Sequence, residues 1–270
     1  MRDSKKSRGE RISREHIERL DCMMDKMRLK RKDSDASKVE NEVLDTRTLM
    51  GLYRLARKGE FDAFGGVINA GKEANVFLAR KGNGSIAIKI YMITTSNFNT
   101  MRDYVLGDKR FAGVRQDRRH IILAWAQKEY KNLQSAKKAG VRVPEVYECY
   151  QNILTMEFIG RDELPFPKLK DICISREQAE YVIEGLLGYI RLLYQKAHLV
   201  HGDMSEYNVL IDPEQLEPIV IDMGQGVLLD HPLAEELVVR DVSNIVRFAK
   251  KHKLSYDVEK CIRDVRGVSI

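Results

Sequence analysis

The sequence predicts an α+β protein with two lobes, a β-rich first lobe and a reduced helical second lobe. Two apolar runs with β-strand character, 65–79 and 86–90, come early in the chain and are broken by turns containing glycine. Longer segments with helical spacing follow at 121–138 and 175–197, and Ser175 is placed to cap the second of them. This order of patterns underlies the two-lobe prediction.

Length and composition exclude several classes of protein. The chain has 270 residues, of which 43% are hydrophobic and 32% charged, enough for a sizeable core. No apolar run approaches the roughly 18 residues of a membrane span, and no signal peptide is visible. We therefore expect a soluble, cytoplasmic protein without membrane contact. The cysteines have no C-x-x-C spacing, which argues against a zinc site; they are Cys22, Cys149, Cys173 and Cys261.

The net charge of +6 is concentrated at the start of the chain. Residues 1–32 contain 12 Lys/Arg and 6 Asp/Glu, so the remaining residues balance to zero. Two interpretations stay open: a solvated tail, or a segment that contacts phosphate backbones or an acidic surface. The segment has no aromatic residue, so base stacking has no support there. The polar stretch 33–38 is predicted to be a linker.

The globular part is predicted to start with a short amphipathic helix at 46–58, with Leu49 and Leu52 on its apolar side. A β-hairpin follows at 65–79, and its turn contains Gly71. This hairpin lacks both the P-loop motif and the dinucleotide-binding glycine motif. Taken alone, the Gly-Lys turn is weak evidence for nucleotide binding.

A lysine and a glutamate are predicted to form an ion pair. In the strand 86–90 the three isoleucines share one face, whereas Ala87 and Lys89 share the other. Glu129 lies on the apolar face of the helix 121–138. A carboxylate among apolar side chains is costly unless it is paired. Pairing Lys89 with Glu129 accounts for both residues.

The densest cluster of polar residues surrounds two short strands, 209–211 and 219–221. If these strands pair antiparallel, Asn208 before the first and Asp222 after the second lie side by side. An amide oxygen and a carboxylate in this arrangement suit Mg²⁺, which keeps water and phosphate oxygens as its other ligands. Asp203, in the preceding loop, is then placed to face a hydroxyl group or a water molecule that approaches the phosphate.

Together these residues resemble the signature set of protein kinases. The resemblance implies a protein-kinase-like fold. Three departures are visible: Gly202 stands where kinases commonly have arginine, no A-P-E triplet follows, and only 46 residues remain after Gly224. The usual peptide-docking subdomain does not fit in that length. The matching segments are I-A-I-K at 86–89, H-G-D at 201–203 and D-M-G at 222–224.

From about Leu49 to Phe248 the chain resembles the RIO atypical serine/threonine protein kinases. The segment 91–111 looks like the flexible loop of the Rio-one subfamily, and the roughly 45 residues before the core are too few for the winged helix of the Rio-two subfamily. In its compactness the chain is more similar to archaeal members of the family than to the longer-tailed eukaryotic members. The motifs that carry the resemblance are G-K-E-A at 71–74, W-A-Q-K-E at 125–129, M-E-F-I-G at 156–160 and H-G-D-M-S-E-Y-N at 201–208.

The resemblance implies a role for each candidate site residue. Asp203 is expected to be the catalytic base, Asn208 and Asp222 the metal ligands, and Asp222 also the acceptor in a phosphoaspartate. Lys89 would anchor the ATP phosphates, with Glu129 as its orienting partner. Further residues around the nucleotide follow from similarity alone: the Glu157 carbonyl and the Ile159 amide at the adenine, Met156 as gatekeeper, and Gly71, Lys72 and Val76 over the nucleotide.

The implied function is ATP-dependent phosphoryl transfer with Mg²⁺, for which Mn²⁺ could substitute. The family is associated with serine autophosphorylation, with ATP hydrolysis, and with maturation of the small ribosomal subunit. The expected partner is therefore a precursor of that subunit, contacted through basic segments, while the protein substrate stays open. Two alternatives also stay open: a small-molecule phosphotransferase of the aminoglycoside or choline kinase type, and a catalytically silent nucleotide-binding scaffold.

We divide the chain into three parts on this basis. Residues 1–45 form the basic extension and linker. Residues 46–156 form the first lobe, with a flexible loop at about 91–120 and a regulatory helix. Residues 157–270 form the second lobe, with the catalytic loop and the metal-binding loop.

Overall fold

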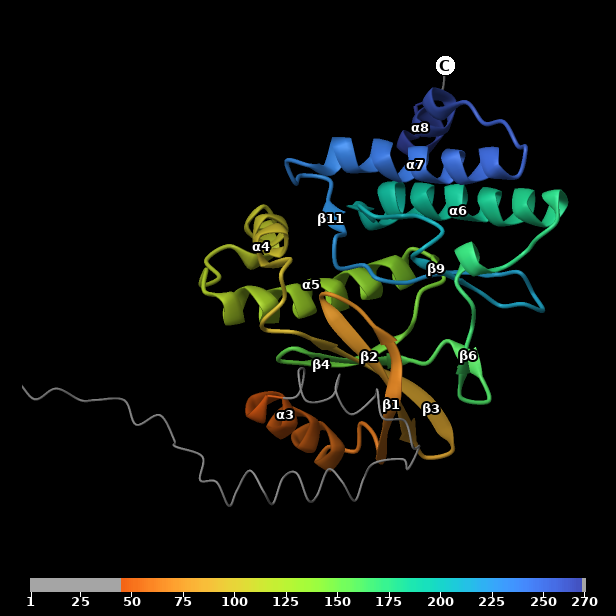
Figure 1. Ribbon diagram of the computed structural model, residues 1–270. Coiled ribbons are helices and arrows are strands. Elements are labelled where there is room, and N and C mark those ends of the chain that lie inside the picture. Colours follow the sequence, from red (N-terminus) through yellow and green to blue (C-terminus); the bar gives the residue numbers. More distant parts are fainter. Residues whose placement is uncertain (1–44, 269–270) are drawn as a thin grey trace, which may run out of the picture.

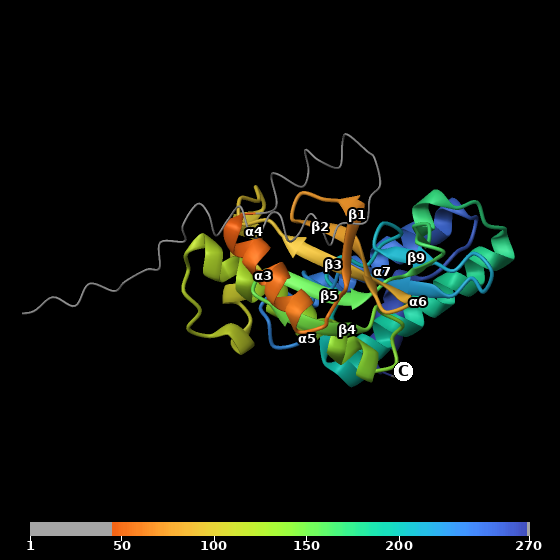
Figure 2. The same cartoon turned by 90° about the horizontal axis from the view of Figure 1, so that it is seen from below.

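The structure is a computed structural model that describes residues 45–268 (Figure 1). The basic segment 1–32 and the linker 33–38 lie outside the described residues. A five-stranded sheet forms one lobe and three stacked helices dominate the other, with helix α5 (Arg118–Lys138) between them (Figures 1 and 2). The prediction of a two-lobed α+β fold is confirmed.

The sheet of the first lobe is entirely antiparallel, with strand order β1-β2-β3-β5-β4. The predicted hairpin is present as β1 and β2, and β3 pairs with β5 such that Lys89 lies opposite Leu154. This central position of β3 places Lys89 in the middle of the sheet. The strands are β1 (Ala63–Ala70), β2 (Ala74–Lys81), β3 (Gly84–Tyr91), β4 (Val146–Tyr150) and β5 (Ile153–Glu157).

The two faces of β3 serve different purposes. Ile86, Ile88 and Ile90 are buried in a core that also contains Leu52 of helix α3 (Thr46–Arg57). The Asp45 side chain caps the start of α3 by accepting a hydrogen bond of 2.7 Å from the Thr48 amide. Because side chains alternate along a strand, the packing of the isoleucines turns Lys89 to the opposite face, toward α5.

Where the sequence predicts a flexible loop at about 91–120, the structure contains helix α4 (Phe98–Leu106) and the 3₁₀ turn η1 (Lys109–Phe111). Met101, Tyr104 and Val105 are buried, and α4 packs against α5. The spacing of these three residues is helical, which the sequence analysis missed. Helix α5 also begins at Arg118 rather than at residue 121, because the Asp117 side chain caps it.

The second lobe is built on helices α6 (Arg176–Ala197), α7 (Ala234–Lys251) and α8 (Val258–Arg266), with α6 and α7 running side by side (Figure 1). The predicted cap of α6 is confirmed: Ser175 and Gln178 form a reciprocal capping box. Short strand pairs and one 3₁₀ turn precede α6 or lie between α6 and α7. They are β6 (Gly160–Arg161) with β7 (Leu164–Pro165), β8 (Leu199–Val200) with β11 (Val227–Leu228), β9 (Val209–Ile211) with β10 (Pro218–Val220), and η2 (Leu169–Asp171).

Within residues 45–268, no helix combines the length and the apolar character needed to cross a membrane. The three cysteines of this part, Cys149, Cys173 and Cys261, are free. The fourth, Cys22, lies outside the described residues.

Replacing Ser175 by alanine removes the acceptor for the Gln178 amide, a hydrogen bond of 3.2 Å at the start of α6. We expect the free energy of unfolding to fall by about 1 kcal/mol, as is usual for a lost N-cap. Urea denaturation measures this change. The control is Ser175→Asp, which keeps a side-chain acceptor; equal losses in both variants would contradict the capping role.

Candidate active site

A cavity of about 620 Å³ lies between the sheet and the second lobe. Its lining includes all the candidate site residues named from the sequence except Asn208: Gly71, Lys72, Val76, Lys89, Glu129, Met156, Glu157, Ile159, Asp203 and Asp222. These residues come from segments up to 151 positions apart in the sequence, and the fold brings them to one place. The cavity is therefore the candidate active site.

Lys89 and Glu129 form the predicted ion pair. The Lys89 Nζ donates to both carboxylate oxygens of Glu129 at 2.8 Å, and the hydroxyl of Tyr91 donates to the same carboxylate. Glu129 and Tyr91 are fully buried. Three donor contacts offset the cost of placing this carboxylate away from water. The sequence analysis did not identify Tyr91, which lies two residues after Lys89 on the same face of β3.

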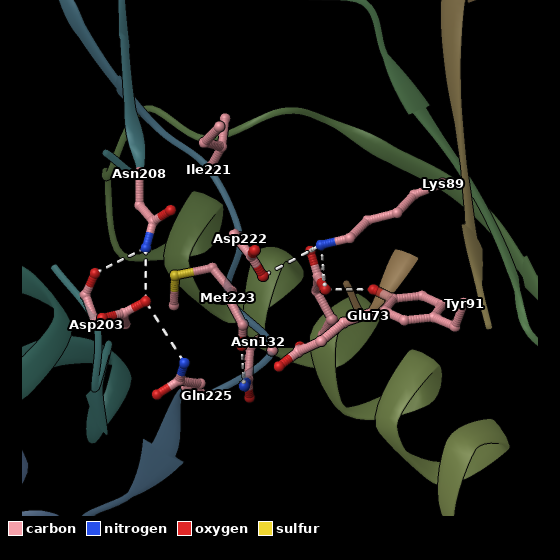
Figure 3. A network of polar contacts seen from close by, with 12 residues as sticks. Glu73, Lys89, Tyr91, Asn132, Asp203, Asn208, Ile221, Asp222, Met223 and Gln225 are labelled. Atoms are coloured by element: carbon pink, nitrogen blue, oxygen red, sulfur yellow. Dashed lines mark hydrogen bonds and ion pairs between the residues drawn. The ribbon is translucent and has the colours of Figure 1, made fainter. Parts of the chain in front are cut away.

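Lys89 also contacts the loop that follows β10. Its Nζ lies 3.1 Å from Oδ1 of Asp222 (Figure 3). Burial raises the pKa of Asp222, but the positive charge of Lys89 prevails and holds it below its usual value. Burial lowers the pKa of Lys89, and the two carboxylates reverse this and raise it. Both groups are therefore ionised at neutral pH, with an anionic oxygen of Asp222 facing the cavity.

Asp203 lies across the cavity from Lys89 (Figure 3). Its carboxylate accepts a hydrogen bond of 2.8 Å from Nδ2 of Asn208 and a longer one of 3.4 Å from Nε2 of Gln225. Burial raises the pKa of Asp203, and the Asn208 hydrogen bond opposes that shift. A carboxylate with a raised pKa is a better proton acceptor than an exposed one.

Asn208 and Asp222 are adjacent because of the β9–β10 pairing that the sequence predicts. Val209 lies opposite Val220, and the Ile221 amide donates to the Asn208 carbonyl at 2.9 Å. The side-chain nitrogen of Asn208 donates to Asp203, which turns its oxygen away from Asp203. No residue within 45–268 donates a hydrogen bond to that oxygen, so it is available to a ligand.

Helix α7 fixes the backbone of the loop 201–208. Asp241, buried in that helix, accepts hydrogen bonds of 2.8 Å from the amides of Gly202 and Met204. Burial raises the pKa of Asp241 to about 7. Gly202 has a φ of +79°, and a Cβ there would lie 2.9 Å from the Gln225 carbonyl oxygen. A residue with a side chain, such as the arginine common in protein kinases, would therefore be strained at this position.

Two residues of α5 hold the loop after Asp222, and the sequence analysis missed both. Lys128 donates to the carbonyls of Gly224, at 2.7 Å, and of Gly226. Asn132, one turn further, donates at 2.8 Å to the carbonyls of Met223 and Gly226. Burial lowers the pKa of Lys128 to about 7. Both residues could have been singled out from the sequence, because they are polar positions on an otherwise apolar face of the helix.

The far wall of the cavity contains the segment predicted to bind adenine. Met156, Glu157 and Ile159 line the cavity at the end of β5. The carboxylate of Glu157 is paired with Arg142 at 2.7 and 2.8 Å. The structure thus brings these residues to the expected wall of the cavity, while their individual roles stay predictions.

The β1–β2 turn forms the remaining wall. Gly71, Lys72 and Val76 line the cavity, as does Glu73, which the sequence analysis did not single out. The Glu73 carboxylate accepts a hydrogen bond of 2.9 Å from Asn97, just before α4. Burial raises its pKa. The turn is thereby linked to the α4 segment.

Comparison with known proteins identifies the family. A family model described as the RIO domain matches residues 75–261. The chain belongs to the RIO family. Its relatives include the RIO-type serine/threonine-protein kinase Rio1 of Haloferax volcanii, 40% identical over 96% of this chain and 87% of that protein. The Rio1 kinase of Methanocaldococcus jannaschii is 38% identical over 89% of this chain and 81% of its own length.

These relatives confirm the predictions of a RIO kinase, of the Rio-one type, and of an enzyme. The human serine/threonine-protein kinase RIO1 is also similar, 37% identical over 86% of this chain, but the match spans only 40% of the human protein. A crystal structure of the Rio2 kinase from Chaetomium thermophilum, in an ADP/Mg²⁺-phosphoaspartate complex, superposes with a TM-score of 0.57. It is 22% identical and covers 82% of this chain and 65% of that one, which confirms the fold.

His201 gives this RIO kinase a testable pH dependence. Its buried ring accepts a hydrogen bond of 3.1 Å from the Asp203 amide through Nδ1, and burial lowers its pKa to about 4. Between pH 4 and 6.5 the unfolded chain therefore binds a proton that the folded chain does not. Stability must fall as the pH falls through this range, by up to about 1.4 kcal/mol per pH unit from this group.

We expect urea denaturation to show this loss in the wild type and a shallower slope in His201→Gln, whose amide does not titrate. Equal slopes in the two proteins would contradict a neutral, buried His201.

Proposed function

We propose that this RIO protein transfers the γ-phosphate of ATP, as an autophosphorylating serine/threonine kinase, as an ATPase, or as both. The observation that carries the proposal is the meeting of Lys89, Asp203 and Asp222 at one end of a single cavity. The other end is lined by the backbone and side chains of Met156–Ile159, which suit a flat adenine ring. ATP spans such a site from base to phosphates.

The donor set near Asp222 fits Mg²⁺. Asp222 presents an ionised carboxylate and Asn208 an amide oxygen without a donor among the described residues. No group of three or more His, Cys, Asp or Glu in residues 45–268 is arranged to hold a metal ion. A hard ion bound by only two protein oxygens keeps water and phosphate oxygens as further ligands, which is typical of Mg²⁺ and acceptable to Mn²⁺. When bound, the ion would neutralise charge that develops on the transferred phosphate.

In phosphoryl transfer, each of the chain's own residues then has a separate role. Lys89, fixed by Glu129 and Tyr91, places a positive charge beside the phosphates. Asp203 accepts the proton of the attacking serine or threonine hydroxyl, while Asn208 keeps the carboxylate in place. The oxygen of the acceptor forms a bond to phosphorus, and the bond from phosphorus to the β-phosphate oxygen breaks, releasing ADP.

In the ATPase route, a carboxylate oxygen of Asp222 attacks the phosphorus instead. An acyl phosphate forms, ADP leaves, and water later hydrolyses the acyl phosphate. Two observations support this route: the ionised state of Asp222, and the phosphoaspartate in the ADP/Mg²⁺ complex of the Rio2 kinase from Chaetomium thermophilum. Phosphoserine and acyl phosphate are distinguishable because hydroxylamine cleaves only the second.

We further propose that a precursor of the small ribosomal subunit is the partner and that the protein acts in the cytoplasm. The support is the RIO family resemblance and the excess positive charge of residues 1–32, which suits a phosphate backbone.

The site assignment is tested by Lys89→Met and Asp222→Asn. Removing Lys89 leaves the buried Glu129 without its cation and takes a charge from the phosphates; Asp222→Asn removes metal charge and the phosphate acceptor. We expect each variant to lose on the order of 100-fold or more in phosphoryl transfer. Thin-layer separation of labelled ATP, phosphate and protein measures all products.

The matched control is Lys138→Met, which removes an exposed lysine at the end of α5 and should retain wild-type turnover. Wild-type turnover by Lys89→Met or by Asp222→Asn would remove the basis of the proposed function.

Deleting residues 1–32 tests the partner. We expect weaker binding to small-subunit particles and a shallower dependence of affinity on salt, because fewer phosphate counterions are released. ATP affinity should stay nearly unchanged. Identical binding curves for both forms across salt concentrations would support the alternative interpretation, that residues 1–32 are a solvated tail.

A further inference from the structure

Helix α7 presents a stripe of polar side chains along the catalytic loop 201–208. The spacing of four, three and four residues places them on one face of the helix, in the order Arg240, Asn244, Arg247 and Lys251. Their hydrogen-bond partners on the loop are the Gly202 carbonyl for Arg240, the Met204 carbonyl at 3.1 Å for Asn244, and the Glu206 carboxylate at 2.7 Å for Lys251. Arg247 donates to Asn244 at 2.7 Å and extends the stripe into solvent.

A second segment that contacts the catalytic loop and the strand after it, residues 168–170, is also basic. The Lys170 amide in η2 donates to the Glu206 carbonyl at 3.1 Å, and the Lys170 ammonium lies 5.4 Å from the ring centre of Tyr207. Lys168 forms a β-bridge with Leu210 and lines the active-site cavity together with Asp203. Positive side chains from two separate elements therefore border the loop. We call Lys168, Lys170, Arg240, Arg247 and Lys251 the basic rim.

Nearby carboxylates neutralise only part of this charge. Glu206 is buried beneath Lys251, and Asp171 lies 3.2 Å from Lys170. No carboxylate of residues 45–268 lies within ion-pair distance of Lys168, Arg240 or Arg247. Arg247 also lies near enough to Lys251 to oppose its protonation, although the hydrogen bond that Lys251 donates to Glu206 raises the pKa of Lys251 overall. The rim thus holds like charges close together, which favours an anionic occupant.

We propose that the basic rim binds an acidic peptide segment that carries the serine or threonine phosphorylated at Asp203. This inference rests on the proposed function and names the class of substrate. An extended segment crossing the catalytic loop would place its hydroxyl at Asp203 and acidic side chains on either side of it, at Lys170 and at Arg247. Exposed charges of this kind act mainly on encounter and on selection between partners.

The observations favour a peptide over a nucleic acid. Nucleotide bases bind to proteins largely by stacking on free aromatic faces. Tyr207, 55% exposed, is the aromatic ring of this surface, and Lys170 already lies over it. Two residues of the rim also lie near Asp203, which is proposed to accept a hydroxyl proton: Lys168 lines the same cavity, and the charge of Arg240 acts on the Asp203 carboxylate. An acceptor side chain must enter at this place.

The experiment uses the full chain with ATP and Mg²⁺ and three peptides that share one serine but differ in its flanking residues: Asp, Gln or Lys. We expect kcat/KM for the Asp peptide to exceed that for the Gln peptide by on the order of tenfold at low salt, with the Lys peptide lowest. The difference should shrink as salt screens the exposed charges.

Variants then locate the effect on the rim. In the double variant Lys170→Ala/Arg247→Ala, the ratio of kcat/KM for the Asp and Gln peptides should fall on the order of fivefold, chiefly through KM of the Asp peptide. Arg247→Lys keeps the charge and should keep most of the ratio. The matched control Lys138→Ala/Arg191→Ala removes the same charge from exposed positions on α5 and α6 and should leave the ratio unchanged.

Four results would overturn the inference. Equal kcat/KM for the three peptides, or no peptide phosphorylation while ATP hydrolysis or autophosphorylation persists, would reject the peptide surface and leave the proposed function standing. An unchanged peptide ratio in the double variant, together with weaker binding of a single-stranded RNA oligonucleotide, would assign the rim to RNA. Absence of phosphate transfer to peptide, protein and water would reject the proposed function as well.

Discussion

The buried pair of Lys89 and Glu129 is the interaction on which the site depends. Neither residue is stable at its position alone: the lysine lies mid-sheet and the glutamate is enclosed by apolar side chains. Their contact fixes β3 against α5 and so sets the distance between the sheet and the helix that separates the two lobes. Asp222 joins the same charge network from the second lobe. One lysine therefore aligns three parts of the chain that are remote in sequence.

The sequence was sufficient for the framework of the fold and for much of the site. Alternating isoleucines around Lys89 correctly separated the two faces of β3, and Ser175 correctly marked the start of α6. Asn208 and Asp222 were placed together by an inferred strand pairing that the structure contains. These inferences succeeded because each rests on local periodicity or on one buried charge that requires a partner.

What the sequence did not reveal depends on contacts between distant segments. Helix α4 lies in the segment that resembles the flexible loop of the Rio-one subfamily, and the helical spacing of its buried Met101 and Val105 was not recognised. Lys128 and Asn132 donate hydrogen bonds to backbone carbonyls. Because every residue has a backbone carbonyl, the sequence does not indicate which one is the partner. The basic rim likewise arises only when α7 and η2 meet the same loop. Side-chain chemistry can be inferred from spacing, whereas backbone partners and shared surfaces require the three-dimensional structure.

Lys128, Glu129 and Asn132 occupy consecutive turns of a single helix, so any movement of α5 involves all three. A helix moves as one body, so a rotation or shift of α5 would disturb the Lys89 contact and the loop of Asp222 together. Under the proposed function, the groups for the phosphates and for the metal would therefore be gained or lost in one step. A partner that displaces α4, which packs on α5, would act on both at once and give an all-or-none response rather than a graded one.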